Sequence, residues 1–252
     1  MDRTLANSLK NGEFLLGDYS SQDFNSLIEY RPVIQKPRRK VTPKSVNGRS
    51  GDLLFDEEAY ENTPLDLELY FKAETEEERN HLRDLITFAF DTGTYLPFVP
   101  YFDKDKIYQV QTTQAPIFSG NIAFGYKEKY TVTFTVKPFK KLIESDKLTM
   151  SSGQTVTNPS RYLSKPVFTI TGSGDMTLNV NGVAFIIKKI QDSIIVNSEI
   201  PSAYRNISGE IYNEENKIYT RDYPVLKSGN NVISWTGSGI TKVEVETRWR
   251  TL

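Results

Sequence analysis

Alternation of apolar and polar residues runs through much of this chain and predicts β-strands. Residues 130–136 alternate aromatic or aliphatic side chains with threonines until Pro138 ends the run. Residues 176–180 alternate in the same way, and Asn181-Gly182 then supplies the residue pair that favours a type I′ hairpin turn into a further strand. Such alternation is typical of antiparallel sheets that bury one face and expose the other.

The last strand predicted from this pattern has the most sharply divided faces. Val243, Val245, Thr247 and Trp249 alternate with charged residues up to Arg250. We therefore expect this segment to form a strand with one apolar face and one charged face.

One segment has the helical period of about 3.6 residues instead. Thr75 and Glu78 match a capping box at its start, and Gly93 is expected to end it in the left-handed conformation. The apolar residues between them share one face of the helix, namely Leu82, Leu85, Ile86, Ala89 and Phe90. His81 lies off this face, so we expect it to be exposed, and a strand over Leu65–Phe71 precedes the helix.

The distribution of these elements predicts a mainly β protein with two domains. A polar stretch between Pro138 and Pro159 separates them. The first domain, residues 1–140, is expected to be a β-rich α+β domain with one helix, and the second, residues 141–252, an all-β sandwich. Gly172-Ser173-Gly174 lacks the spacing of a dinucleotide-binding loop and precedes a strand, so we interpret it as a turn.

The residue composition excludes several kinds of chemistry. The 252 residues include no cysteine, which rules out thiol nucleophiles, disulfides and thiolate zinc sites. They include a single histidine, His81, which rules out histidine clusters. No run of residues approaches the roughly 18 apolar positions of a membrane span. With 31 basic and 32 acidic residues, the chain does not have the charge of a dedicated nucleic-acid-binding protein, and we expect no catalytic residues, no metal site and no cofactor.

Charge is nevertheless unevenly distributed within the first domain. From Arg31 to Arg49 all seven charged residues are basic, and from Asp52 to Asp84 twelve acidic residues accompany three basic ones. The basic block consists of Arg31, Lys36, Arg38, Arg39, Lys40, Lys44 and Arg49. The acidic block that we single out consists of Asp56, Glu57, Glu58, Glu61, Glu76 and Glu77. Two solvated faces would explain this pattern; the alternative hypothesis is that the blocks are complementary surfaces that meet between copies of the chain.

Two further functions remain open from the residues alone. Trp235 and Trp249 are a candidate platform for stacking sugar rings, which would make the second domain a carbohydrate-binding module. A glycosidase needs two carboxylates, and neighbouring pairs occur at Glu57-Glu58 and Glu214-Glu215. We expect both pairs to lie in polar loops with solvated side chains.

Several segments with turns occur in a recognisable order along nearly the whole chain. They are 17–24, 32–34, 46–53 and Tyr60 in the first half, and 158–159, 166–170, 178–182 and 223–233 in the second half. The chain closes on Arg248-Trp249-Arg250. Their order and the chain length resemble the distal tail protein (Dit) family of siphophages that infect Gram-positive bacteria.

This resemblance implies a structural role in a phage virion. Members of the family form a hexameric ring at the end of the tail tube, with tail-tube-like first domains around a channel and galectin-like second domains that dock other components. The implied partners are further copies of the chain, the major tail tube protein, the tape measure protein, the tail-tip or tail-associated lysin protein and receptor-binding proteins. DNA would only pass through the channel, no membrane partner is implied, and assembly would take place in the host cytoplasm.

The resemblance also sets finer expectations. Residues 243–252 are expected to return to the first domain, as the last strand does in family members. A channel that passes DNA should lack a basic wall, so we expect mixed or acidic residues to face it. Asn47–Gly51 is expected to form a tight turn between strands. The alternative function, recognition of host cell-wall saccharide, would use the second domain.

Overall fold

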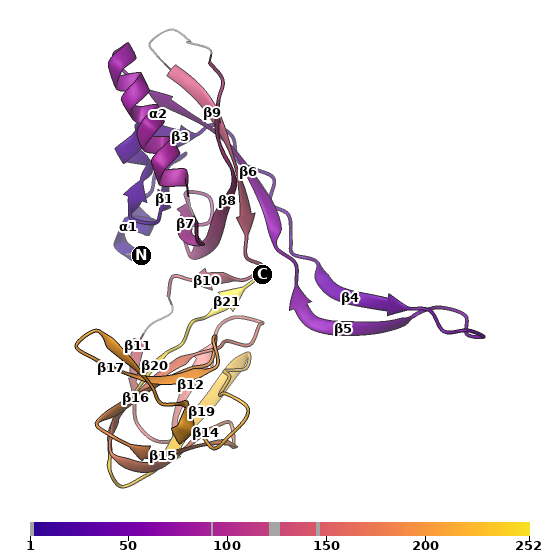
Figure 1. Cartoon of the computed structure of the whole chain (residues 1–252), viewed down its shortest axis with the longest axis vertical. Helices are drawn as coiled ribbons and strands as arrows, with labels where there is room; N and C mark the ends of the chain where they lie inside the picture. Colours follow the sequence, from indigo (N-terminus) through magenta and orange to yellow (C-terminus); the bar gives the residue numbers. More distant parts are fainter. Residues whose placement is uncertain (1–2, 92, 121–126, 145–146) are drawn as a thin grey trace. The chain divides into compact units, whose positions relative to one another are not determined.

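The computed structural model divides the chain into two compact units (Figure 1). The first comprises Met1–Ile143 with Leu252, and the second comprises Glu144–Thr251. The structure describes all residues except 1–2, 92, 121–126 and 145–146. Among the described residues, no helix is long and apolar enough to cross a membrane.

An antiparallel sheet forms the body of the first unit. Its strands lie in the order β2-β1-β7-β8-β9-β6-β3, and β10 pairs with β8. They are β1 (Phe14–Leu16), β2 (Tyr19–Ser20), β3 (Ser26–Ile28), β6 (Thr63–Lys72), β7 (Leu96–Pro100), β8 (Lys106–Phe118), β9 (Lys127–Val136) and β10 (Lys140–Leu142). The strands expected at residues 130–136 and Leu65–Phe71 are the central neighbours β9 and β6.

The helix α2 (Glu76–Phe90) covers one face of this sheet (Figure 1). The Thr75 side chain accepts a hydrogen bond from the Glu78 backbone N–H at 3.1 Å, as the capping pattern predicts. The helix closes on Asp91, whose N–H donates to carbonyls of the last turn. Asp91 has a φ of −79°, so the helix ends two residues before Gly93 and at a residue that is not left-handed, and the prediction that Gly93 ends it is wrong.

Aromatic rings form the centre of the core beneath α2. The Phe90 ring stacks on Phe134 of β9 with centroids 5.9 Å apart, and Phe134 lies 5.4 Å from Phe98 of β7. All three side chains are fully buried. The helix face predicted from the sequence is therefore the face that packs on the sheet, and His81 is exposed as expected.

The opposite face of the sheet is partly covered near its β1–β7 end. A short helix, α1 (Arg3–Ser8), supplies Ala6, which packs with Leu9, Leu15 and Val99. Leu15 and Val99 alternate along β1 and β7 with residues of the main core, so both faces of these two strands are buried. A single 3₁₀ turn, η1 (Ser21–Phe24), follows β2.

Two strands of the first unit stand apart from this sheet. β4 (Arg39–Lys44) and β5 (Leu53–Tyr60) pair with each other as an antiparallel ribbon, visible in Figure 1 as a separate extension. The expected tight turn at Asn47–Gly51 joins them, with positive φ of 77° at Gly48 and 82° at Gly51. We call residues 39–60 the arm.

The second unit contains two antiparallel sheets. One has the order β11-β20-β13-β16-β17-β18, and the other has the order β12-β19-β14-β15. The elements are β11 (Lys147–Met150), β12 (Gln154–Asn158), β13 (Val167–Gly172), β14 (Gly174–Val180), β15 (Val183–Ile190), β16 (Ser193–Asn197), β17 (Ser202–Ile207), β18 (Glu210–Asn213), η2 (Glu215–Lys217), β19 (Gly229–Thr236), β20 (Ile240–Glu246) and β21 (Arg250–Thr251). Of residues 243–252, expected to return to the first domain, residues 243–246 pair within this unit as part of β20, whereas Leu252 belongs to the first unit.

Each sheet of the second unit buries one face. Phe168 and Val243 are fully buried on the six-stranded sheet, and Leu178 and Ile187 are fully buried on the four-stranded sheet. Alternate residues along the same strands are exposed or half-buried, as in a sandwich. The turn at Asn181-Gly182 has positive φ at both residues, which confirms the predicted type I′ hairpin. The mainly β fold class predicted from the sequence is also confirmed.

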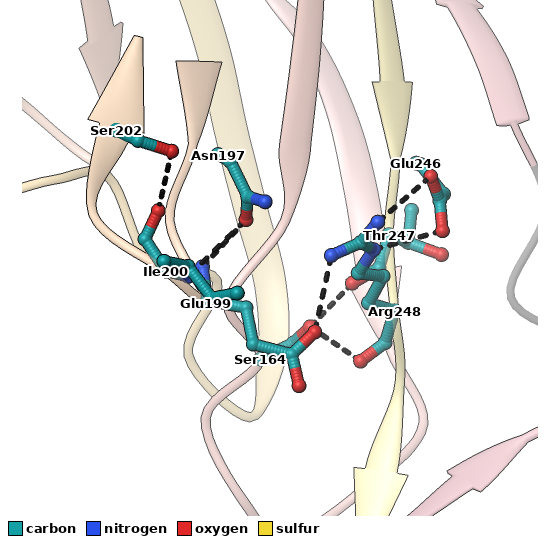
Figure 2. Close-up of polar contacts among 8 residues, drawn as sticks. All are labelled: Ser164, Asn197, Glu199, Ile200, Ser202, Glu246, Thr247 and Arg248. Carbon is teal, nitrogen blue, oxygen red and sulfur yellow. Dashed lines mark hydrogen bonds and ion pairs between the residues drawn. The ribbon is translucent and has the colours of Figure 1, made fainter. Parts of the chain in front are cut away.

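The last predicted strand ends earlier than its alternation suggests. β20 stops at Glu246, and Arg248 adopts a left-handed φ of 49°. Figure 2 shows what holds this bend: the Ser164 hydroxyl donates to the carbonyl oxygens of Thr247 and of Arg248, the latter at 2.8 Å. The Arg248 guanidinium pairs with Glu246 at 2.8 Å and with Glu199 at 3.0 Å. Side-chain bonds from a distant loop therefore override the local pattern.

Two glycine turns of the second unit touch each other. Gly172 is the last residue of β13, and only Ser173 separates it from β14, so the turn expected at 172–174 is a one-residue connection. Gly172 has a φ of 140°, and a Cβ there would overlap the carbonyl oxygen of Gly239. A Cβ on Gly239 would overlap the carbonyl oxygen of Ser173. The Ser173 N–H donates to the Gly239 carbonyl at 3.0 Å, so the two backbones are held at a distance that excludes a side chain.

Candidate self-association surface

The arm is a β-ribbon without a buried side chain. Every residue of β4 is exposed, and β5 is exposed or half-buried throughout. Its large apolar residues include Leu54, 71% exposed, and Phe55, 54% exposed. In the register of the ribbon, Leu54 lies opposite Pro43, and Phe55 opposite Thr42. Successive residues point to opposite faces, so each face of the arm presents an apolar side chain to its surroundings.

The basic block lies on the arm and on the segment that leads to it. Arg39, Lys40 and Lys44 belong to β4, and Arg49 to the tight turn. Arg38 immediately precedes β4 and is exposed. Arg31 and Lys36 come earlier: the Arg31 guanidinium lies 5.6 Å from the centroid of the Phe102 ring, and the Lys36 ammonium donates to the Leu252 carbonyl at 3.3 Å.

Half of the acidic block shares the arm with these cations. Asp56, Glu57 and Glu58 are exposed residues of β5, and Glu61 follows it. Arg39 Nε donates to both Asp56 oxygens, at 2.8 and 2.9 Å. This bond and the Glu58 N–H lower the pKa of the Asp56 carboxyl. The Glu57 carboxylate accepts from the Thr42 hydroxyl at 2.8 Å. Part of the charge complementarity predicted between copies is thus satisfied inside one hairpin.

Glu76 and Glu77 lie elsewhere, in the first turn of α2. The Glu76 carboxylate pairs with Arg79, whose side chain is almost fully buried. Beside it, Arg83 Nε donates to Glu128 of β9 at 2.8 Å, and Glu128 is 1% exposed. This cluster ties the helix to the sheet.

The sheet face that points away from α2 is polar over β6 and β9. Asp66 and Glu68 alternate with the buried leucines of β6, and they lie opposite Thr133 and Thr131 of β9. The Thr133 hydroxyl donates to the Asp66 carboxylate at 2.8 Å. Thr135 continues the same row. This face therefore carries hydroxyl groups and acidic side chains in its centre, and Lys72, Lys127 and Lys129 at one end.

The candidate sugar platform of the second unit is not assembled. Trp249 is 5% exposed, which leaves no ring face for a sugar, so its assignment to such a platform is wrong. Trp235 is half-buried on β19, opposite the buried Leu178. Glu214, expected to be solvated, is 6% exposed and accepts from Lys217 at 2.6 Å. Glu214 and Glu215 therefore do not form the solvated pair of carboxylates that was expected.

Comparison with known proteins locates the whole chain in one structural group. No protein-family model matches it, and no curated protein does. SPP1 Dit, described as a paradigm of the hub adsorption apparatus in phages that infect Gram-positive bacteria, matches with a TM-score of 0.70 at 13% identity over 95% of this chain and 99% of that chain. The chain has the fold of SPP1 Dit. The predicted resemblance to the distal tail protein family is confirmed at the level of the fold.

Chains of the phage p2 baseplate share the SPP1 Dit fold more distantly. Two structures of that baseplate in its activated conformation, with Sr and with Ca, match with TM-scores of 0.55 and 0.53. Both are 9% identical to this chain and cover 92% of it and 96% of the baseplate chain. The similarity therefore spans both units in all three structures.

Sequence reasoning identified the charged residues of the arm but missed its apolar ones. Leu53, Leu54 and Phe55 form a short apolar run between Asp52 and Asp56. This run is the available signal, because three consecutive apolar residues cannot all point to one buried face of a strand. Unless both faces of the strand are covered, as they are in β1, at least one of the three side chains is exposed.

Proposed function

We propose that this protein is a distal tail hub of a phage: a structural virion protein that assembles into a hexameric ring and joins the tail tube to the tail tip or baseplate. The observation that carries this proposal is the match to SPP1 Dit over nearly the full length of both chains. A similarity limited to one unit would support a common module, whereas this one includes both units and their order along the chain.

The arm is the element through which we propose that copies associate. An isolated two-stranded ribbon is at best marginally stable in water, because it buries too little apolar surface to offset its ordering. Leu54 and Phe55 would become buried if the arm lay on the next copy. Contact between an arm and a different surface of the neighbour is heterologous, and heterologous contacts close into rings when the rotation allows it.

Charge would contribute less to this contact than the full basic and acidic blocks of the sequence suggest. Arg39 and Asp56 already neutralise each other within the arm, and Glu76 pairs with Arg79. Arg38, Lys40, Lys44 and Arg49 remain exposed on or beside the arm as cations for an acidic neighbour. Such exposed pairs are weakened by salt, so the electrostatic part of assembly should decrease as ionic strength rises.

The polar face of β6 and β9 is our proposed channel wall. Asp66 and Glu68 would repel phosphate, and Thr131, Thr133 and Thr135 would offer hydroxyl groups without positive charge. The lysines at one end of this face make the proposed wall mixed in charge, and its acidic and hydroxyl centre would not retain DNA.

The remaining assignments follow from the hub role. The tube side of the ring would contact the major tail tube protein and the tape measure protein. The second units would dock the tail-tip or tail-associated lysin protein and receptor-binding proteins. We propose no catalytic step and no cofactor, and we place the protein in the virion after assembly in the host cytoplasm.

Light scattering of the purified full chain, alone and with the tail tube protein, tests the ring. We expect a species of about six chain masses that appears as a closed circle in electron micrographs. The double variant Leu54→Asp/Phe55→Asp should remain a folded monomer, since both side chains are exposed in the single chain. Phe88→Asp is the matched control, because Phe88 is 72% exposed on α2, outside the arm. A wild-type chain that stays monomeric with its tube partner would refute the proposal.

A further inference from the structure

The outermost strand of the six-stranded sheet in the second unit is an unprotected edge. β18 pairs with β17 on one side, and all four of its residues are exposed. Ile211 is 69% exposed and Tyr212 48%, and Ile207 at the end of β17 is 44% exposed. An edge strand with exposed apolar residues is a template for pairing with another strand, and proteins usually protect such edges with charge, proline or a covering segment.

The other sheet edges of this unit have such protection. β15 is covered by the segment after η2, because the Tyr219 N–H donates to Ile186 at 2.9 Å and the Ile186 N–H donates to the Thr220 hydroxyl at 2.8 Å. β11 begins with Lys147, and its Met150 is buried. β12 exposes one glutamine and two threonines, and its valine and asparagine are buried. β18 is therefore the edge that combines open backbone with exposed apolar side chains.

The hairpin geometry determines which backbone groups of β18 point outward. Ser208 and Gly209 both have positive φ, which defines a type I′ turn whose flanking residues, Ile207 and Glu210, exchange hydrogen bonds. The Glu214 N–H also donates to the Ala203 carbonyl at 2.9 Å, so positions 210 and 214 are both bonded to β17. Bonds to the partner strand alternate along an antiparallel pair. The backbone N–H and C=O groups of Ile211 therefore point to the open edge.

We propose that β18 is a self-association edge, at which two copies of the chain pair antiparallel and continue their six-stranded sheets into one. In an antiparallel pair, residues whose backbone N–H and C=O groups point toward the partner strand lie opposite each other. Ile211 of one copy therefore lies opposite Ile211 of the second copy. In that register Glu210 lies opposite Tyr212, so no like charges face each other. A shift by one position on each strand would place Glu210 opposite Glu214, which disfavours it.

The features of this edge favour a second copy of the chain over an unrelated strand. The pair is isologous, so each apolar side chain that one copy exposes is matched by the same side chain of the other. The strand has four residues and a single acidic side chain, Glu210, so self-pairing does not concentrate charge. The contact is separate from the arm and does not depend on ring formation.

A single introduced cysteine tests the register directly, because the natural chain has none. Opposed residues of a hydrogen-bonded antiparallel pair have Cβ atoms about 5.5 Å apart, which is wide for a disulfide but within reach of a short bis-maleimide. With this reagent, the full-length Ile211→Cys variant should form a covalent dimer severalfold more readily than Ile200→Cys. Ile200 is the matched control, since it is 70% exposed in the turn before β17.

A second measurement reports the association without a cross-link. Ile211→Lys should lower the mass of the associated protein twofold in sedimentation, whereas Ile200→Lys should leave it unchanged. The arm variant Leu54→Asp/Phe55→Asp should still form the Ile211→Cys dimer, which separates this contact from the ring. Equal cross-linking at positions 211 and 200 would overturn the proposal. Cross-linking of Ile211→Cys to a different tail protein, with no dimer, would overturn it in favour of a foreign strand.

Discussion

Two hairpins of this protein obey the same local rules but have opposite surroundings. The β14–β15 hairpin and the arm are both antiparallel, and both turn at residues with positive φ. In β14–β15, Phe185 and Ile187 are buried and β19 extends the sheet on one side. In the arm, Phe55 and every other side chain remain exposed or half-buried.

The difference shows which hairpin the single chain can stabilise. The β14–β15 hairpin gains its stability from a core within the second unit, so it is complete in one molecule. The arm has no such core, and its order as a ribbon would be secured by contact with another molecule. Changes to the first hairpin should therefore act on folding, and changes to the second on association.

The largest expected effect contrasts one phenylalanine of each hairpin. Phe185→Ala removes a buried ring that lies 5.3 Å from Tyr223, and should lower the free energy of unfolding by about 3–5 kcal/mol. Phe55→Ala should leave the stability of the monomer unchanged and weaken assembly. Urea denaturation of both variants, with light scattering, measures the contrast. A large loss of monomer stability in Phe55→Ala would show that the arm is packed within its own chain.

The next effect contrasts two ion pairs of the first unit. Glu128→Gln leaves Arg83 without its carboxylate and removes the second carboxylate, 4.0 Å away, from the buried Arg79, which keeps Glu76; it should cost about 3 kcal/mol in thermal or chemical denaturation. Asp56→Asn breaks the Arg39 pair on the arm, where both groups are exposed, and should have no measurable effect on stability. Equal effects of the two substitutions would contradict the distinction between body and arm.

The smallest expected effect is a dependence of stability on pH that comes from Lys140 in the main sheet of the first unit. Lys140 is buried beside the Tyr108 ring, 4.9 Å from its centroid, and burial, with the nearby charge of Lys36, lowers its pKa to about 8. An unfolded lysine has a pKa of about 10.4, so between about pH 8 and 10 the unfolded chain binds more protons. The free energy of unfolding should therefore rise with pH across this range.

Lys140→Met tests this dependence, since it removes the titrating group but keeps an apolar stem. The rise in stability between about pH 8 and 10 should flatten in this variant. Lys44→Met on the arm removes a charge at an exposed position and is the control. An unchanged slope in Lys140→Met would assign the rise to another group.

The sequence predicts the elements that bury one face, because burial requires apolar residues at regular spacing on that face. The helix α2 was found because one face packs on a sheet, and β6, β9 and β14 because one face of each is buried. The sequence predicts strands on both sides of the Asn47–Gly51 turn but not their extent, because neither face of the ribbon is buried and so alternation is not required of Leu53–Tyr60. The missed apolar residues of the candidate surface, Leu54 and Phe55, belong to this unpatterned segment.

Other errors come from contacts that are distant in sequence. The strand expected to reach Arg250 bends after Glu246, because Ser164 holds the following carbonyls (Figure 2). Glu214 is buried rather than solvated because Lys217 and Arg205 surround its carboxylate. Neither partnership is visible in a local pattern of hydrophobic and polar residues.

The glycine crossing in the second unit has a consequence for how this protein can vary. A methyl group on Gly172 would overlap the Gly239 carbonyl oxygen, and one on Gly239 would overlap the carbonyl oxygen of Ser173, the residue after Gly172. A mutation at one of them cannot be rescued by a smaller residue at the other, because glycine is already the smallest. The two positions are thus coupled without any room for compensation, and descendants of this chain should retain both residues or rebuild both turns together.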